Sequence, residues 1–93
     1  HITGGGLPGN VNRILPAGCD AAITKGTWEV PAIFERIRDL GQVDDDEMAR
    51  VFNMGVGMVI AMPAAEVAAA RRAAPELLTI GEIVAGDGNV QLI

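Results

Sequence analysis

The segments HITGGGLPGN at positions 1–10 and FNMGVGM at positions 52–58 decide how this chain is interpreted. Glycine lacks a Cβ, so it adopts positive φ angles and lets a backbone approach a ligand or another segment closely. The first segment starts with an apolar–polar pair, Ile2-Thr3, which leads directly into three glycines. This order is typical of a strand end followed by a turn. It predicts that the sequence is part of a larger protein.

Length and composition indicate at most one small domain over residues 1–93, with 49% hydrophobic and 20% charged residues, too apolar for a disordered segment. The net charge is −5 and the basic residues are scattered, which argues against a nucleic-acid partner.

Cys19 is the only cysteine, which excludes an internal disulfide and a cysteine-based metal site. The longest apolar run, 56–65, is too short to span a bilayer, and no signal peptide is visible. We therefore expect a cytoplasmic protein without a membrane partner.

Hydrophobic periodicity and Gly/Pro positions predict an α+β or α/β protein with a small mixed sheet. Helices are expected at 7–15, 31–40, 44–52 and 63–74, and strands at 20–24, 56–62, 78–84 and 90–93. The second helix has an amphipathic pattern, and Gly41 is its expected C-terminal cap. The acidic run 44–47 is interpreted as the first turn of a helix rather than as a metal site. We also expect 56–62 to be buried on both faces, the alanines of 63–74 to pack inward, and 86–89 to form a hairpin turn.

The glycine loop at 4–6 has the features of an anion site, because free N–H groups converge where a glycine turn leads into a helix. Gly4, Gly6 and Gly9 match the spacing of the dinucleotide fingerprint, but the acidic residue that should close the next strand is missing. No Lys-Ser/Thr pair follows the last glycine, so the loop is not a Walker loop either. The pattern alone favours a structural turn and a phosphate contact equally.

The second glycine segment, 52–58, lies between a predicted helix and the most apolar predicted strand. A glycine-containing strand entry with Met54 and Met58 in the core explains it more simply than a binding site does. The sequence shows no Ser/His/Asp set, no paired carboxylates on one helix face and no metal-ligand cluster. We therefore predict no catalytic residue and no metal ligand within this chain.

Taken together and in this order, several short motifs make the chain resemble the aminoimidazole ribonucleotide synthetase family, the phosphoribosylformylglycinamidine cyclo-ligases. The resemblance covers the whole chain but only part of the C-terminal domain of that family. The motifs are HITGGGLPxN at 1–10, RILP at 13–16, Trp28, PxIF at 31–34, Glu47-Met48, FNMGxGM at 52–58 and IGEI at 80–83. Position 9 departs from the pattern, because it is Gly where the family often has an acidic or polar residue.

The resemblance implies a three-layer α/β/α domain, truncated at its N-terminus, which lines a cleft in a homodimeric enzyme. That enzyme uses ATP and Mg²⁺ to activate the formyl oxygen of formylglycinamidine ribonucleotide, and an internal amine then closes the imidazole ring. Mg²⁺ and most of the ATP are expected to bind to the N-terminal half, so residues 1–93 alone should have no ligase activity. By the resemblance, the residues that contact a phosphate or line the cleft are Thr3, Gly4, Gly5, Gly6, His1 and Asn53. A Gly5→Val change is then expected to remove activity and leave the fold largely intact.

Two alternatives are retained. One is another ATP-binding member of the same superfamily, of the formylglycinamidine synthetase, selenophosphate synthetase or thiamine-phosphate kinase type. The FNMGxGM segment and Trp28 favour the cyclo-ligase over these. The other is a non-catalytic self-association module, since an open sheet edge and exposed apolar surface would pair with another chain.

Overall fold

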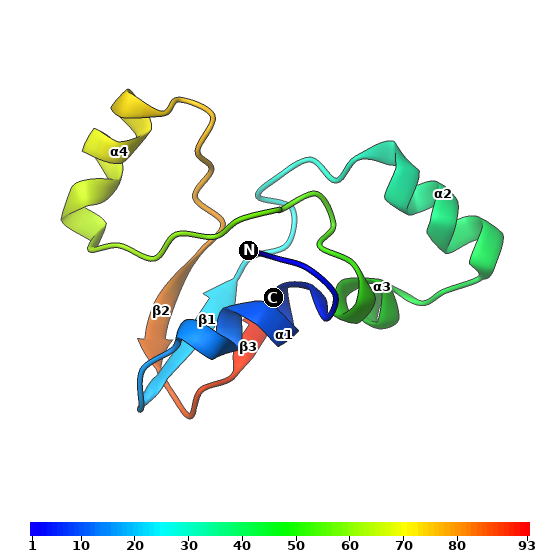
Figure 1. Ribbon diagram of the computed structural model, residues 1–93, viewed down its shortest axis with the longest axis horizontal. Helices are drawn as coiled ribbons and strands as arrows, with labels where there is room; N and C mark the ends of the chain where they lie inside the picture. The colour runs from blue at the N-terminus through cyan, green and yellow to red at the C-terminus, as the bar shows by residue number, and fades with distance from the viewer.

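The computed structural model describes residues 1–93 (Figure 1). Two short helical segments, α1 (Gly6–Val11) and η1 (Asn12–Ile14), precede the first strand. The remaining elements are β1 (Cys19–Ile23), α2 (Ala32–Gly41), α3 (Asp45–Val51), η2 (Ala64–Glu66), α4 (Val67–Ala73), β2 (Gly81–Ala85) and β3 (Val90–Leu92). The predicted α+β class is therefore confirmed.

The sheet has three strands in the order β2-β1-β3. β1 pairs with β2 antiparallel, with Ala21 opposite Ile83, and with β3 parallel, with Ala22 opposite Gln91. The mixed sheet is confirmed, but the predicted hairpin is wrong, because β2 and β3 lie on opposite sides of β1 and do not pair. The 86–89 segment instead crosses the end of β1, where the amides of Gly86 and Gly88 donate hydrogen bonds to the carbonyls of Gly18 and Cys19.

The hydrophobic core is small and lies between α1 and the sheet. It consists of the buried residues Ile2, Leu7, Val11, Ala21 and Ile23. Leu7 and Val11 come from one face of α1, and Ala21 and Ile23 come from alternate positions of β1, as helical and strand periodicities require. Figure 1 shows α1 beside the sheet, whereas α2 and α4 project away from it. Within residues 1–93 the second helical layer of the three-layer arrangement stays a prediction.

Residues 56–62 do not form the buried strand that was predicted. Only two backbone hydrogen bonds involve this segment: the amide of Ile2 donates to the carbonyl of Gly57, and the amide of Val56 donates to that of Asn53. Met58 and Ile60 are 56% and 58% exposed. A continuous apolar run predicts burial, but a strand also needs a neighbouring backbone, and this chain places none along 58–62.

Two helices are less buried than their sequences suggest. None of the residues of α4 is buried, so the expected inward packing of its alanines is wrong. Its Val67 and Ala70 face an open groove instead of a packed core. In α2 the apolar residues Ile33 and Leu40 remain exposed, and the left-handed cap residue is Gln42 (φ 51°) rather than Gly41. The acidic run does open α3 as predicted, since Asp44 Oδ1 accepts a hydrogen bond from the Glu47 amide at 2.8 Å.

Candidate functional site

The first glycine segment forms a tight turn at the start of α1. The amide of Gly6 donates to the carbonyl of Thr3 at 3.1 Å, and the amide of Gly9 donates to that of Gly5 at 3.1 Å. The amides of Thr3, Gly4 and Gly5 have no acceptor in the chain. Three consecutive backbone donors are thus available to a ligand, whereas Gly6, which was also a candidate, already uses its amide internally.

Gly4, Gly5 and Gly6 would each respond differently to an added side chain. Gly6 packs so closely on α3 that a Cβ would overlap the carbonyl oxygens of Ala49 and Phe52. Gly5 has φ 99°, where L side chains are strained, so the expectation that Gly5→Val leaves the fold intact is wrong. A Cβ added at Gly4 would meet no heavy atom within 4 Å, so the outer side of Gly4 is open space.

Asn10 was not among the predicted site residues, yet it organises the loop. Its side chain is buried, and Nδ2 donates to the carbonyls of Thr3 at 3.3 Å, Gly4 at 3.3 Å and Gly6 at 2.8 Å. Its Oδ1 accepts from Thr3 Oγ1 at 3.3 Å. The signal in the sequence was the Asn at the end of the first motif, one helical turn beyond the glycines.

The second glycine segment is held in an irregular conformation. Asn53, one of the predicted cleft residues, accepts a hydrogen bond from the Gly55 amide through its Oδ1 at 2.8 Å. Its side-chain Nδ2 makes no hydrogen bond within the chain and remains free. Met54 has φ 55°, an unfavourable value for a residue with a side chain, and Trp28 Nε1 donates to its carbonyl at 3.1 Å. Gly55 contacts the ring of Pro31 so closely that a Cβ would not fit. These bonds hold the segment in a shape that its own backbone preferences do not favour.

The two glycine segments meet in the folded chain. The Ile2 amide donates to the carbonyl of Gly57 at 2.9 Å, and Gly6 lies against Phe52. Phe52 in turn packs edge-on against Phe34, with ring centroids 5.9 Å apart. The structure therefore brings together the predicted residues Thr3, Gly4, Gly5, Gly6 and Asn53, along with Trp28 and Pro31 of the connecting motifs. His1 precedes this cluster and is exposed.

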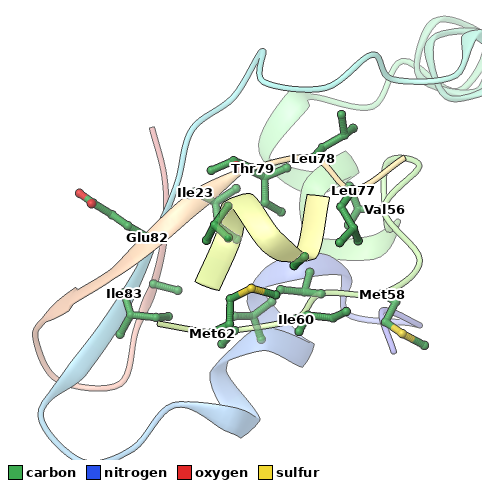
Figure 2. Close-up of a pocket in the computed structure, with 18 of the residues that line it drawn as sticks. Ile23, Val56, Met58, Ile60, Met62, Leu77, Leu78, Thr79, Glu82 and Ile83 are labelled. Atoms are coloured by element: carbon green, nitrogen blue, oxygen red, sulfur yellow. The ribbon is translucent and has the colours of Figure 1, made fainter. Parts of the chain in front are cut away.

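An apolar cavity lies apart from the glycine loop. It is an apolar groove of about 400 Å³ between segment 56–62, α4 and the 76–83 segment. Figure 2 shows Ile60, Met62, Leu77 and Ile23 around this space, while the carboxylate of Glu82 points away from the other labelled side chains. Residues 1–6 are not part of its lining. The groove has the character of an unfilled packing surface rather than of a phosphate site.

Asp20 is the one buried carboxylate of the fold, and it was missed as a special position. Its Oδ1 accepts from the amides of Asp87 at 2.7 Å and Asn89 at 2.8 Å, and its Oδ2 accepts from Gln91 Nε2 at 3.0 Å. The hydrogen bond from the Asn89 amide, supported by those of Asp87 and Gln91, holds the pKa of the Asp20 carboxyl below its usual value. Because these bonds go to the β2–β3 crossover and to Gln91 of β3, the role of Asp20 is structural.

No group of three or more His, Cys, Asp or Glu side chains lies together in a way that could hold a metal ion. None of the helices combines the length and the hydropathy needed to cross a membrane.

The motifs that converge at this cluster are shared with a known family. The family model described as AIR synthase related protein, C-terminal domain, matches residues 1–93. The chain belongs to this family. The resemblance inferred from the motifs is thereby confirmed, and the loop at 3–6 and the segment at 52–58 are features of an AIR synthase related C-terminal domain.

Relatives of this AIR synthase related domain have consistent names. A phosphoribosylformylglycinamidine cyclo-ligase of Caldanaerobacter subterraneus is 50% identical over 96 residues, covering 99% of this chain and 29% of the relative. A protein of Vigna unguiculata named phosphoribosylformylglycinamidine cyclo-ligase, chloroplastic/mitochondrial, is 42% identical, covering 95% of this chain and 24% of the relative. A bifunctional purine biosynthetic protein of Schizosaccharomyces pombe is 48% identical over 84 residues, covering 90% of this chain and 10% of the relative. The domain thus spans less than a third of the length of each of these relatives.

Proposed function

We propose that this domain is the C-terminal part of an ATP-dependent ligase that cyclises formylglycinamidine ribonucleotide to aminoimidazole ribonucleotide in purine biosynthesis. The observation that carries the proposal is the family match over all 93 residues, together with relatives named as this cyclo-ligase at 42–50% identity. In the proposed reaction ATP supplies the phosphoryl group that activates the formyl oxygen, with ADP and phosphate as products.

The contribution of this domain is to line the substrate cleft with backbone donors. The free amides of Thr3, Gly4 and Gly5 support a contact with a phosphate of ATP or of the ribonucleotide, because oxyanions bind well to converging N–H groups. The free Nδ2 of Asn53 and the exposed imidazole of His1 are the further candidates for polar contacts. Each of these groups would bind and orient a ligand, and none would perform a chemical step itself.

The rest of the proposal concerns the whole enzyme. We propose that Mg²⁺ and most of the ATP bind outside residues 1–93, since this chain brings no carboxylate cluster together that fits a metal ion. We further propose that the enzyme is a cytoplasmic homodimer whose ligands are ATP and formylglycinamidine ribonucleotide, with no nucleic-acid or membrane partner. The net charge of −5 supports the absence of a nucleic-acid partner.

The test is an assay of ADP release by the full-length protein that carries these residues, with and without formylglycinamidine ribonucleotide. We expect ADP release that depends on this substrate, together with formation of aminoimidazole ribonucleotide. ATP binding without this turnover would reject the cyclo-ligase and direct the search to the substrates of the related synthetases and kinases.

A further inference from the structure

The side chain of Asn10 is buried directly behind the glycine loop. Asn10 is 7% exposed. The two hydrogens of its side-chain Nδ2 are donated to three acceptors, the carbonyls of Thr3, Gly4 and Gly6. Its side-chain Oδ1 accepts a hydrogen bond from the hydroxyl of Thr3. Only the NH₂ group can face three carbonyl oxygens, so these contacts also fix which way round the amide lies.

These bonds determine where the free amides of the loop point. In a trans peptide unit, the C=O and the following N–H point in opposite directions. The Thr3 carbonyl shares its peptide unit with the Gly4 amide, and the Gly4 carbonyl shares its unit with the Gly5 amide. Because Asn10 holds both carbonyls on the buried side, the amides of Gly4 and Gly5 are directed away from it, toward the open side where Gly4 has no neighbour.

We propose that Asn10 is a positioning residue, which holds the Thr3–Gly6 loop so that the Gly4 and Gly5 amides bind a phosphate of a substrate. The proposal rests on the proposed function and adds a residue that the site prediction did not contain. The loop needs such a residue, because three glycines have many accessible conformations and only a few present two adjacent amides to one oxyanion.

Asparagine fits this role better than the other polar residues of similar size. Aspartate would place a carboxylate against the carbonyl oxygens of Thr3, Gly4 and Gly6 and would add a negative charge behind a phosphate site. Serine retains a donor but is too short to serve three acceptors. An aliphatic residue would leave the carbonyls without donors in a buried position.

The experiment uses the full-length enzyme with Asn10→Asp as the test variant and Asn12→Asp as the matched control. Asn12 lies two residues further along, is exposed and makes no side-chain hydrogen bond, so its variant carries the same charge change without touching the loop. For each protein we would measure kcat, the KM for ATP, the KM for formylglycinamidine ribonucleotide and the thermal midpoint. NMR spectra of enzyme labelled with ¹⁵N at glycine would show whether the backbone amides of Gly4, Gly5 and Gly6 stay conformationally ordered in each variant.

We expect Asn10→Asp to raise the KM of one phosphate-bearing substrate at least tenfold with kcat within about threefold of wild type, and Asn12→Asp to behave as wild type. The substrate affected would identify whose phosphate the loop contacts. Unchanged KM values would overturn the proposal. This includes the case in which kcat falls only in proportion to the lost folded protein, since a purely structural role predicts a lower apparent kcat at constant KM.

A second measurement covers a variant that does not fold and separates this proposal from the proposed function. In the wild-type enzyme, ATP and formylglycinamidine ribonucleotide are titrated separately while the Gly4 and Gly5 amide resonances are followed. A shift with either ligand supports the loop contact on which the positioning role of Asn10 depends, even if turnover fails, in which case only the proposed reaction is rejected. If neither ligand moves these resonances, the positioning role of Asn10 is rejected even where turnover is normal.

Discussion

The amide of Ile2 donates a hydrogen bond to the carbonyl oxygen of Gly57 at 2.9 Å, and this bond joins the two glycine segments of the chain. It is the one backbone hydrogen bond that the extended run 57–62 receives from the rest of the chain. The bond places the loop at 3–6 beside the segment at 52–57. Residues more than 50 positions apart in the sequence therefore form one cluster.

Gly4→Val should impair catalysis without impairing folding. Gly4 has no positive φ and no atom near a Cβ position, so the free energy of unfolding should change by less than about 0.5 kcal/mol. The new side chain would cover the free amides, and we expect kcat/KM of the full-length enzyme to fall at least about tenfold. Gly9→Ala is the control, because position 9 has equally open space. Wild-type turnover by Gly4→Val would reject the loop as a ligand contact.

Gly6→Ala should have the opposite effect to Gly4→Val, because it should lower the stability of the fold rather than only block ligand binding. Its Cβ would overlap the carbonyl oxygens of Ala49 and Phe52, and φ is 62°, a value that strains an L residue. We expect the free energy of unfolding to fall by roughly 3 kcal/mol or more, measured by chemical denaturation followed by circular dichroism. A stability equal to that of wild type would mean that α1 and α3 do not pack through this glycine.

Trp28→Phe tests the bond that stabilises the second glycine segment. The change keeps an aromatic ring but removes the Nε1 donor to the Met54 carbonyl. Because Met54 has φ 55° and then loses a partner, we expect a loss of about 1–2 kcal/mol in the free energy of unfolding. Denaturation followed by far-UV circular dichroism measures it, and an unchanged midpoint would contradict the assignment.

Asp20→Asn should destabilise the β2–β3 crossover in a pH-dependent way. The folded pKa of Asp20 lies below its usual value of 3.8, so the stabilising contribution is present above 3.8 and is lost as the pH falls through the folded pKa. We expect the variant to be less stable than wild type at pH 7, and the difference to shrink in strong acid. Asp87→Asn, in the same crossover but with an exposed side chain, should behave as wild type. A difference that stays constant with pH would contradict the role of the charge.

The apolar groove predicts that isolated residues 1–93 self-associate. Ile60, Leu78 and Ile83 line it and are 58%, 60% and 46% exposed. Light scattering should show a mass that rises with concentration, and Ile60→Glu should reduce it. The matched control is Ile33→Glu, because Ile33 is also 58% exposed but lies on α2, outside the groove. A monomer at high concentration, or an equal effect of both variants, would argue against the groove as the contact.

Local sequence signals were sufficient to determine much of the secondary structure. Asp44 and the acidic turn after it set the start of α3, because a side-chain cap and the helix dipole act within one turn. The strand at Cys19–Ile23 and the order of motifs that identifies the family were also readable from the sequence. These features depend on neighbours in the chain, which a sequence displays directly.

Only the tertiary structure decided which segments pair and which residues build the site. The Val56–Met62 run is apolar enough for a buried strand, but strand formation depends on a neighbouring backbone that sequence periodicity does not specify. The position of β1 between β2 and β3 is likewise a choice among pairings of equal local propensity. The sequence alone determined that a glycine loop precedes a helix. Only the folded chain determined that Asn10 directs the loop amides outward. That orientation depends on hydrogen bonds from the Asn10 side chain to backbone carbonyls four to seven residues earlier in the chain.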